Sequence, residues 1–378
     1  MKTKGWMTGG LWACALLGCG GGGGGFSVLT YNTGLARGLV SYTDQRGPEV
    51  ARALGRSGAE LACLQEVWES PERDQILAAT GKQLPHALVP EPLSDASDAE
   101  PACSAAERAL VLACVEPACG AVPADQLSGC VVEHCAELTA QVSARCQSCL
   151  FINVGKSIWE IDQGCAYGGG TKRYGGSYGL MLLSQAPLLE QDRIELDSTL
   201  LRRAVLYAKL EVPRLGKVHV FCTHLSSLFS EVLPYPGDYG SWNEENAREI
   251  EQFLQFVGSK VGGVEDELVL SMGDMNCGPD PDLVPVSALH FDALRAAMDG
   301  EFSLEKPGER CTYCRDNALV PAWEAPGTID HIFYRNFQAG GEVQRAFTAP
   351  VGLSIDGETL RLPLSDHYGV QVELPCAH

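Results

Sequence analysis

Side chains able to bind a metal ion or move a proton stand directly after short apolar runs in this chain. They form six motifs, in chain order Tyr31-Asn32, Gln65-Glu66-Val67, Thr223-His224-Leu225, Gly273-Asp274-Met275-Asn276, Ile329-Asp330-His331 and Pro363-Leu364-Ser365-Asp366-His367. Several follow runs typical of β-strands, namely residues 26–31, 61–64, 218–222 and 268–271. Carboxylates, amides and imidazoles at several strand ends predict one site across a sheet edge, because the sheet would fix their geometry.

These residue types suit the attack of water on a phosphate ester, assisted by a divalent cation. Mg²⁺ takes oxygen ligands, usually one or two carboxylates together with water and substrate phosphate. Glu66 and Asp366 are the expected carboxylates. A water nucleophile needs a base whose pKa lies near neutrality, and we assign this role to His367. Asp330 is expected to hold the far nitrogen of that imidazole.

The remaining motifs are expected to act on the phosphate and the water. Asn32 and Asn276 can donate hydrogen bonds to phosphate oxygens, and Asp274 can orient the water. His224 can stabilise charge on the pentacoordinate phosphorus or protonate the leaving oxygen.

Each motif taken singly also has a structural explanation. Gly273-Asp274-Met275-Asn276 can be a strand-to-turn connection, because Asn and Asp tolerate left-handed backbone. His224 can be a hydrogen-bonded residue at a strand end, and Asp330-His331 can be a surface pair in which His331 has no catalytic role. The combination and order of the motifs favour the catalytic interpretation.

The ordered motifs resemble the endonuclease/exonuclease/phosphatase superfamily, from Phe26 to Leu374 with one interruption. Within it, Gln65-Glu66-Val67-Trp68-Glu69-Ser70 and Gly179-Leu180-Met181-Leu182-Leu183-Ser184 are similar to segments of neutral sphingomyelinases. One departure is Asn32-Thr33-Gly34-Leu35, where those enzymes often carry an aromatic residue after the Asn.

The resemblance implies a deoxyribonuclease-I-like fold, a four-layer α-β-β-α sandwich of two mixed sheets. It implies that Glu66 binds the metal, that Asn32, Asp274 and Asn276 lie in the metal and phosphate region, and that His224 contacts phosphate. It also implies that His367 is the base and that Asp330 holds it. Mg²⁺ is the expected cofactor, with Mn²⁺ or Ca²⁺ as alternatives. Strand-like and helix-like runs alternate as an α/β fold requires, with helices expected at 48–57, 71–82, 243–259 and 282–298.

The N-terminus has the marks of an export signal. Lys2 and Lys4 precede a short apolar stretch ending Ala15-Leu16-Leu17-Gly18-Cys19, which resembles a bacterial lipobox. We expect a signal peptide at 1–18, with Cys19 acylated at the start of a Gly-rich tether, 19–25. An ordinary cleaved signal is the alternative. The expected location is the outer membrane as a lipoprotein, otherwise the periplasm or the medium.

Sixteen cysteines agree with export, because disulfides persist in oxidising compartments. Eight lie between Cys103 and Cys165, and the first six, from Cys103 to Cys146, follow a repeat of Cys, ten residues, Cys, four residues. Residues 91–165 are therefore predicted to be an insertion into the 26–378 catalytic domain, made of three short antiparallel helices stapled by disulfides. Eight cysteines allow 105 pairings, and the sequence does not choose among them.

The other cysteines carry separate expectations. Cys311 and Cys314 are expected to form a disulfide beside the site, with a zinc site as the alternative. Cys63 and Cys222 are expected to be small apolar residues in core strands. The insertion itself can be a substrate-selecting lid, a membrane-docking surface or a stabilising decoration.

Two basic segments are open to a phosphate-contacting role. The Gly-rich loop 168–176 contains Lys172 and Arg173, although a linker closing the insertion is the favoured interpretation. Arg202 and Arg203 open a strand and can face the substrate.

Charge bears on the substrate. The formal net charge is −20, and no basic stripe with interleaved aromatic residues is present, which counts against long polyanions. A zwitterionic headgroup such as phosphocholine tolerates this charge.

We therefore predict an exported, membrane-anchored, Mg²⁺-dependent phosphodiesterase that acts by in-line attack of water. A sphingomyelinase-like activity on phospholipid is the leading expectation. An extracellular nuclease acting on DNA is the alternative, and a non-catalytic binding module with the same fold is a third. We expect a monomer and infer no protein partner.

Overall fold

The computed structural model describes most of the chain from Gly25 to Leu374. The described residues are 25–93, 100–168, 170, 172–213, 215–228, 234–262, 266–280, 285–306, 310–322, 324–337 and 341–374. The predicted signal peptide and Cys19 lie outside this part. Among the described helices, none combines the length and the hydropathy needed to cross a bilayer.

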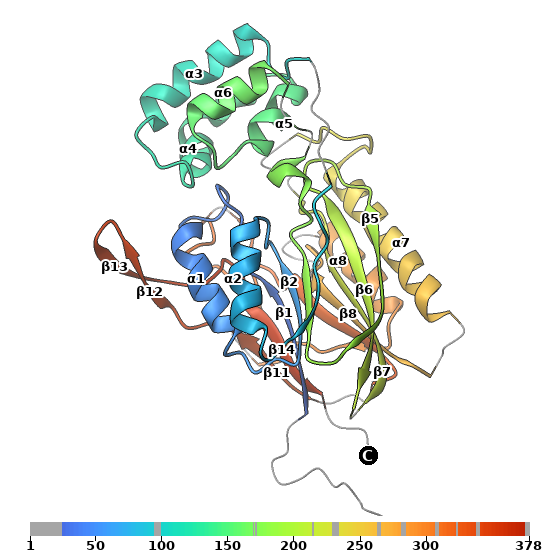
Figure 1. The fold of residues 1–378 in the computed structure, drawn as a ribbon. Coiled ribbons are helices and arrows are strands. Elements are labelled where there is room, and N and C mark those ends of the chain that lie inside the picture. The colour runs from blue at the N-terminus through green and yellow to red at the C-terminus, as the bar shows by residue number, and fades with distance from the viewer. Residues whose placement is uncertain are drawn as a thin grey trace, which may run out of the picture.

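Two mixed sheets form the centre of the molecule (Figure 1). In spatial order, the described strands of the first are β11 (Glu342–Ala346), β14 (Gly369–Leu374), β1 (Phe26–Asn32), β2 (Leu61–Gln65), β4 (Met181–Ser184) and β3 (His86–Leu88). Those of the second are β5 (Leu188–Leu196), β6 (Arg203–Val212), β7 (Gly216–His224), β8 (Leu268–Asp274), β10 (Asp330–Arg335) and β9 (Gly300–Glu301). The pairs β1–β2 and β7–β8 are parallel. A separate hairpin, β12 (Val351–Ile355) and β13 (Glu358–Leu362), projects from the sandwich.

Alternating side chains along the strands build three apolar layers. Val28 faces the core between the sheets, together with Leu206 and Leu270. Its neighbour Leu29 faces the opposite way, because successive side chains of a strand alternate, and packs in the cluster of α1 (Thr43–Leu54) and α2 (Ser70–Thr80). The outer face of the second sheet packs in the same manner against α7 (Trp242–Val261) and α8 (Pro285–Ala296). The predicted four-layer α-β-β-α sandwich is confirmed.

The predicted helices match these four elements, with one error of position. The helix expected at 48–57 begins five residues earlier, at Thr43. Pro48, where the predicted helix begins, lies inside α1. At the true start of the helix, the Thr43 hydroxyl donates a hydrogen bond to the Val40 carbonyl. The Pro preference for a helix start is only statistical, and here it misled the boundary.

The Cys-rich segment lies between β3 and β4 and is helical, as expected. Its described part contains four helices and not the predicted three: α3 (Ala105–Cys119), α4 (Leu127–Thr139), α5 (Ala144–Ile152) and α6 (Ile158–Ala166). The additional helix arises because Ser143 caps α5 by accepting a hydrogen bond from the Cys146 N–H, which separates α5 from α4. Figure 1 shows the four helices gathered beyond one end of the sandwich, next to α1 and α2.

All eight cysteines of this segment pair with one another. The disulfides are Cys103–Cys146, Cys114–Cys135, Cys119–Cys130 and Cys149–Cys165. Cys311–Cys314 is also a disulfide, as predicted, so these two thiols are not available to zinc. Cys63 and Cys222 lie in core strands as expected, but they are not separate apolar residues, because they form a disulfide. They lie on β2 and β7, face each other across the two sheets, and are joined with a Cα–Cα distance of 5.5 Å.

Candidate active site

Strand ends from both sheets meet at one edge of the sandwich. β1 ends at Asn32 and β2 at Gln65, and these two residues are register partners. In the second sheet, Asp274 at the end of β8 is the register partner of both His224 and Asp330. The Asn32 amide donates a hydrogen bond of 2.9 Å to Asp274, which connects the two sheets at this edge.

Asp274 is the centre of this cluster and is buried. Its Oδ1 accepts a 2.9 Å hydrogen bond from the Asn276 backbone N–H, and its Oδ2 lies 3.4 Å from His224 Nε2 and 3.9 Å from His367 Nε2. Burial, together with the charge of Asp330, raises the pKa of Asp274 to about 6. Asp274 therefore lies next to the Asn32 amide and to the imidazoles of His224 and His367.

His367 and Asp330 form the predicted dyad. His367 Nδ1 and Asp330 Oδ2 are 2.8 Å apart, and both side chains are buried. Burial alone would lower the pKa of His367, but the nearby Asp330 carboxylate, with Asp366 and Asp274, holds that pKa well above its ordinary value. Because Nδ1 donates to Asp330, Nε2 is left facing Asp274 and is the atom through which His367 can exchange a proton with a reacting group.

Glu66 and Asp366 lie beside the dyad, as the metal prediction requires. Burial and the charges of Asp366 and Asp274 raise the pKa of Glu66 to about 7. Glu66 also adopts a left-handed backbone with φ of 60°, a conformation that non-glycine residues rarely take and that clusters at functional sites. Asp366 Oδ1 accepts a 3.1 Å hydrogen bond from the Ser365 hydroxyl.

The donor set fits a hard divalent cation. Burial is the larger cause of the raised pKa of Glu66, and the charges of the Asp366 and Asp274 carboxylates raise it further. A bound cation would relieve the repulsion among these carboxylates, and oxygen donors are the ligands that Mg²⁺ prefers. Asp274, Asp330 and His367 also bring ligand atoms within 4.8 Å of one another, but the hydrogen bond between Asp330 and His367 already accounts for that cluster.

Gly34 lies in the segment Asn32-Thr33-Gly34-Leu35, against the carboxylate of Asp366. Its φ is +57°, and a Cβ there would lie 2.5 Å from Asp366 Oδ1 and 2.6 Å from the Ser365 hydroxyl. Its N–H donates to the Asn32 side chain at 3.0 Å. The segment therefore passes so close to Asp366 that only glycine fits.

His224 is buried and electrically neutral. Burial, with the nearby charges of Arg203 and His367, lowers its pKa well below the ordinary value. Its Nε2 faces Asp274, whereas its buried Nδ1 has no hydrogen-bond partner among the described residues. A neutral imidazole can donate a hydrogen bond to an oxyanion, but it does not bring a positive charge to it.

Asn276 and His331 are held by other parts of the fold. The Asn276 amide donates a 2.8 Å hydrogen bond to the Leu225 carbonyl, which leaves one of its two amide hydrogens for a ligand. His331 bonds to Glu301 at 2.5 Å and to the Cys277 carbonyl at 2.8 Å. It is fully buried, so the surface-pair interpretation of Asp330-His331 is wrong.

Arg202 and Arg203, at the start of β6, make different contacts. Arg202 pairs with Glu195 at 2.6 Å, whereas Arg203 is buried over the Trp68 ring, 5.8 Å from its centroid. The Nε and Nη1 atoms of Arg203 have no hydrogen-bond partner within the described part of the chain. Its charge acts on Glu249 and then on Glu66 and Asp274, so Arg203 is a buried cation at the margin of the site that makes no ion pair within 4.0 Å among the described residues.

Lys172 and Arg173 support the linker interpretation of the Gly-rich loop. Lys172 donates to the Thr199 carbonyl at 2.8 Å, and Arg173 donates to the Phe151 and Arg37 carbonyls at 2.7 and 2.5 Å. Both charges are thus used to connect the insertion to the sandwich.

Several supporting residues were missed from the sequence. Arg46 is fully buried in α1 and donates hydrogen bonds to the Gly34 and Leu364 carbonyls at 2.6 and 2.8 Å. Asn317 donates to the Ser365 and Asp366 carbonyls at 2.9 and 3.1 Å. Arg46 therefore connects the segment after Asn32 to the segment before Asp366, and Asn317 holds the second of these two segments. An arginine in a polar helix and an asparagine in a loop give no sequence signal for such a role.

Comparison with known proteins gives a family match and several similar folds. The sequence profile of the Endonuclease/Exonuclease/phosphatase family matches residues 29–367. The structure is similar to sphingomyelinase C from Streptomyces griseocarneus, with a TM-score of 0.56 and 18% identity over 93% of this chain and 99% of the other.

Two further structures extend the fold comparison. Beta toxin from Staphylococcus aureus, in a structure with bound magnesium ions, gives a TM-score of 0.56 and 13% identity over 93% of this chain and 99% of the other. TDP2 from Caenorhabditis elegans gives 0.53 and 13% over 93% and 75%. A comparison with curated proteins found no match. At these identities the structural similarity establishes the fold alone.

Proposed function

The chain belongs to the endonuclease/exonuclease/phosphatase family, and on that premise we propose that it is a divalent-metal-dependent phosphodiesterase that hydrolyses its substrate with an activated water. The observation that carries the proposal is the buried His367–Asp330 pair, whose Nε2 faces Asp274 beside two further carboxylates. This arrangement combines a proton acceptor with a cluster of oxygen ligands, the two requirements of metal-assisted hydrolysis.

Each residue has a defined part in the proposed reaction. Asp274 orients the water, and His367 Nε2 accepts its proton while Asp330 holds the imidazole and stabilises its charged form. The neutral His224, the side-chain amide of Asn32 and the backbone N–H of Asn276 are hydrogen-bond donors next to Asp274. Arg203 supplies a fixed positive charge at the margin, which favours the developing negative charge on the phosphoryl oxygens.

Glu66 and Asp366 are the residues that would hold the metal, with Asn32 and Asp274 beside them. A bound Mg²⁺ would supply Lewis-acid polarisation of a phosphoryl oxygen. The magnesium ions reported with beta toxin, which has the same fold, support this choice of cofactor.

We propose a phospholipid with a zwitterionic headgroup, such as sphingomyelin, as the substrate. The similarity to sphingomyelinase C supports this choice, and the formal net charge of −20 disfavours a long polyanion.

We also propose that the protein is exported and anchored through Cys19. The six disulfides among the described residues support an oxidising compartment.

The substrate proposal is tested by parallel assays. The purified protein is given sphingomyelin vesicles or plasmid DNA with Mg²⁺, with EDTA and His367→Ala as controls. Release of phosphocholine that both controls abolish is the expected result. DNA cleavage without phosphocholine release would overturn the lipid substrate and keep the phosphodiesterase, and inactivity toward both substrates would remove the support for either.

A further inference from the structure

An apolar cavity of about 200 Å³ lies inside the Cys-rich insertion. Side chains from all four helices line it, including Val111, Val115, Val131, Leu150 and Ile161. Leu39, from the segment that follows Asn32, closes one side. Nothing in the proposed hydrolysis uses this cavity.

The polar side chains of the cavity wall are engaged with one another or with the backbone, although Arg108 Nε and Asp162 Oδ1 make no hydrogen bond within the described part of the chain. Arg108 and Asp162 pair with each other at 3.3 Å, so their charges cancel. Gln147 donates to the Val142 carbonyl at 2.8 Å, Thr139 donates to the Cys135 carbonyl at 3.2 Å, and Ser128 donates to the Gly38 carbonyl. A polar ligand would lose its hydration there without compensation, so the wall selects an apolar one.

The disulfides explain why such a space can persist. Helices of 9 to 15 residues are too short to be stable without support. Two disulfides join α3 to α4, and Cys149–Cys165 joins α5 to α6. Because these bonds fix the helices, the insertion does not depend on a tightly packed core for its fold.

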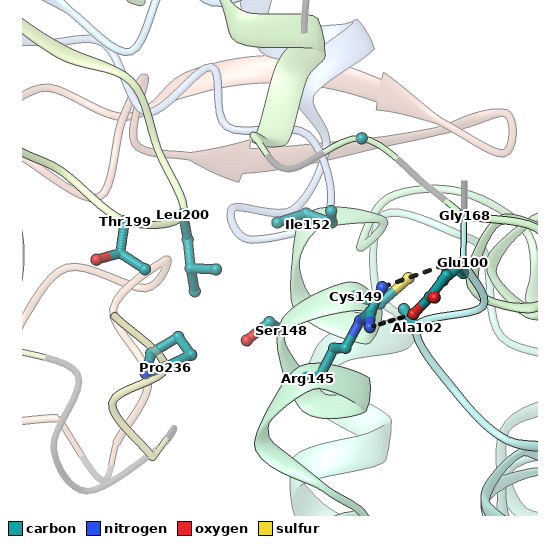
Figure 2. A pocket seen from close by; sticks show the side chains of 11 residues that line it. Glu100, Ala102, Arg145, Ser148, Cys149, Ile152, Gly168, Thr199, Leu200 and Pro236 are labelled. Carbon is teal, nitrogen blue, oxygen red and sulfur yellow. Dashed lines mark hydrogen bonds and ion pairs between the residues drawn. The ribbon is translucent and has the colours of Figure 1, made fainter. Parts of the chain in front are cut away.

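A second cavity differs from the first in having an exposed charged pair in its wall. It has a volume of about 320 Å³ and lies between α5 and the segment containing Thr199 and Leu200 (Figure 2). Glu100 and Arg145, which pair at 3.6 Å, stand in its wall. Its charged wall gives no preference for an apolar ligand.

We propose that the cavity inside the insertion binds one unbranched aliphatic chain of a lipid. Apolar cavities of roughly 150 Å³ already take up small hydrocarbons, and a slender chain fills a concave space between helices. A folded partner is a poor occupant, because stable protein interfaces bury on the order of 1,000 Å² or more.

The position of the cavity brings the bound chain close to the segment leading from the active site. Gly38 and Gly155 are in backbone contact, and the Tyr42 N–H donates to Asp125 at 3.0 Å, so the insertion rests on residues 38–42. The binding itself goes beyond the proposed hydrolysis and does not depend on it.

Titration calorimetry of the full chain with dodecanoate, below its micelle concentration, tests the proposal. Saturable binding of one dodecanoate is expected, with none of butanoate. Val115→Phe fills the cavity and should weaken binding about tenfold or more. Ala113→Phe places the same side chain on the exposed face of α3 and should leave binding unchanged.

Two further measurements keep the outcome decisive. His367→Ala should bind dodecanoate as the wild type does, which separates this proposal from a failure of the catalytic one. With that variant, dodecylphosphocholine shows whether a phospholipid chain or a free fatty acid binds more tightly. Absence of saturable binding to the wild type would overturn the proposal. So would unchanged affinity in both Val115→Phe and Val111→Phe when circular dichroism shows that they are folded.

Discussion

At the scale of single residues, the site depends on a histidine held by a buried carboxylate and on carboxylates that crowd one another. The sequence predicted the members of this set, because their order and residue types are specific. It did not predict that His224 is neutral or that Arg203 is unpaired, because both properties arise from burial by distant segments.

Asp330→Asn tests the dyad. The amide cannot stabilise the protonated imidazole, so turnover should fall by a factor of about 10² to 10⁴ while the fold is kept. Steady-state hydrolysis of a phosphodiester, per folded molecule, measures the effect. Glu301→Gln is the matched control, because it changes the other buried histidine–carboxylate pair, His331–Glu301, away from the site. Equal losses in both variants would show that the dyad has only a structural role.

Gly34→Ala tests the close approach to Asp366. Its methyl group would lie 2.5 Å from Asp366 Oδ1, so Asp366 must move and both Mg²⁺ affinity and turnover should fall about tenfold or more. Gly58→Ala is the control, because Gly58 also has a positive φ of +74° but nothing within 4 Å of its Cβ position. Activity and metal titration of the two variants should therefore differ even where their loss of stability is similar. Normal metal affinity in Gly34→Ala would contradict the placement of Asp366.

At the scale of secondary-structure elements, the sequence predicted that strands end at the site but not how the sheets face each other. The Cys63–Cys222 disulfide shows the difficulty. Both cysteines were predicted to lie in core strands, yet strand periodicity says nothing about which residues of two separate sheets oppose one another. Arg46 was missed for a similar reason, since one of its partners, Leu364, lies far away in the chain, at a sequence separation of 318.

A charged cluster joins three strands at the opposite end from the site. Glu267, just before β8, pairs with Lys209 of β6 at 2.7 Å and with His219 of β7 at 2.5 Å. These hydrogen bonds lower the pKa of Glu267 to about 2. A depressed carboxyl pKa stabilises the fold above the unfolded value of about 4.3, and this stabilisation is lost as the pH falls toward 2.

Glu267→Gln should therefore be less stable than the wild type at pH 7, by about 1 kcal/mol because the cluster is partly exposed. The difference should shrink steadily between pH 4.5 and pH 2. Urea unfolding at a series of pH values measures it. A difference in the free energy of unfolding that does not depend on pH would show that the charge of Glu267 does not stabilise the folded protein.

At the scale of the whole molecule, two parts are stabilised differently. The sandwich has three continuous apolar layers, whereas the insertion has one smaller apolar cluster and four disulfides. Cysteine spacing predicted a helical insertion cross-linked by disulfides. It could not predict the number of helices or the disulfide pairing, because these depend on helix capping and on how the helices pack.

Reduction with a strong thiol should unfold the insertion before the sandwich, because short helices lose their main constraint. Hydrogen exchange followed by mass spectrometry should show loss of protection first in residues 103–165. The strands β6 and β7 serve as the internal reference. Simultaneous loss of protection in the insertion and in the sandwich would contradict the claim that the two parts are stabilised differently.

The central claim, that water activated by His367 attacks phosphorus, is tested most directly by hydrolysis of sphingomyelin or a synthetic phosphodiester in ¹⁸O-labelled water with Mg²⁺. We predict that one labelled oxygen enters the phosphate-containing product and that His367→Ala reduces its formation by about 10² or more. Label in the alcohol product, or unchanged formation of labelled phosphate by His367→Ala, would contradict the account.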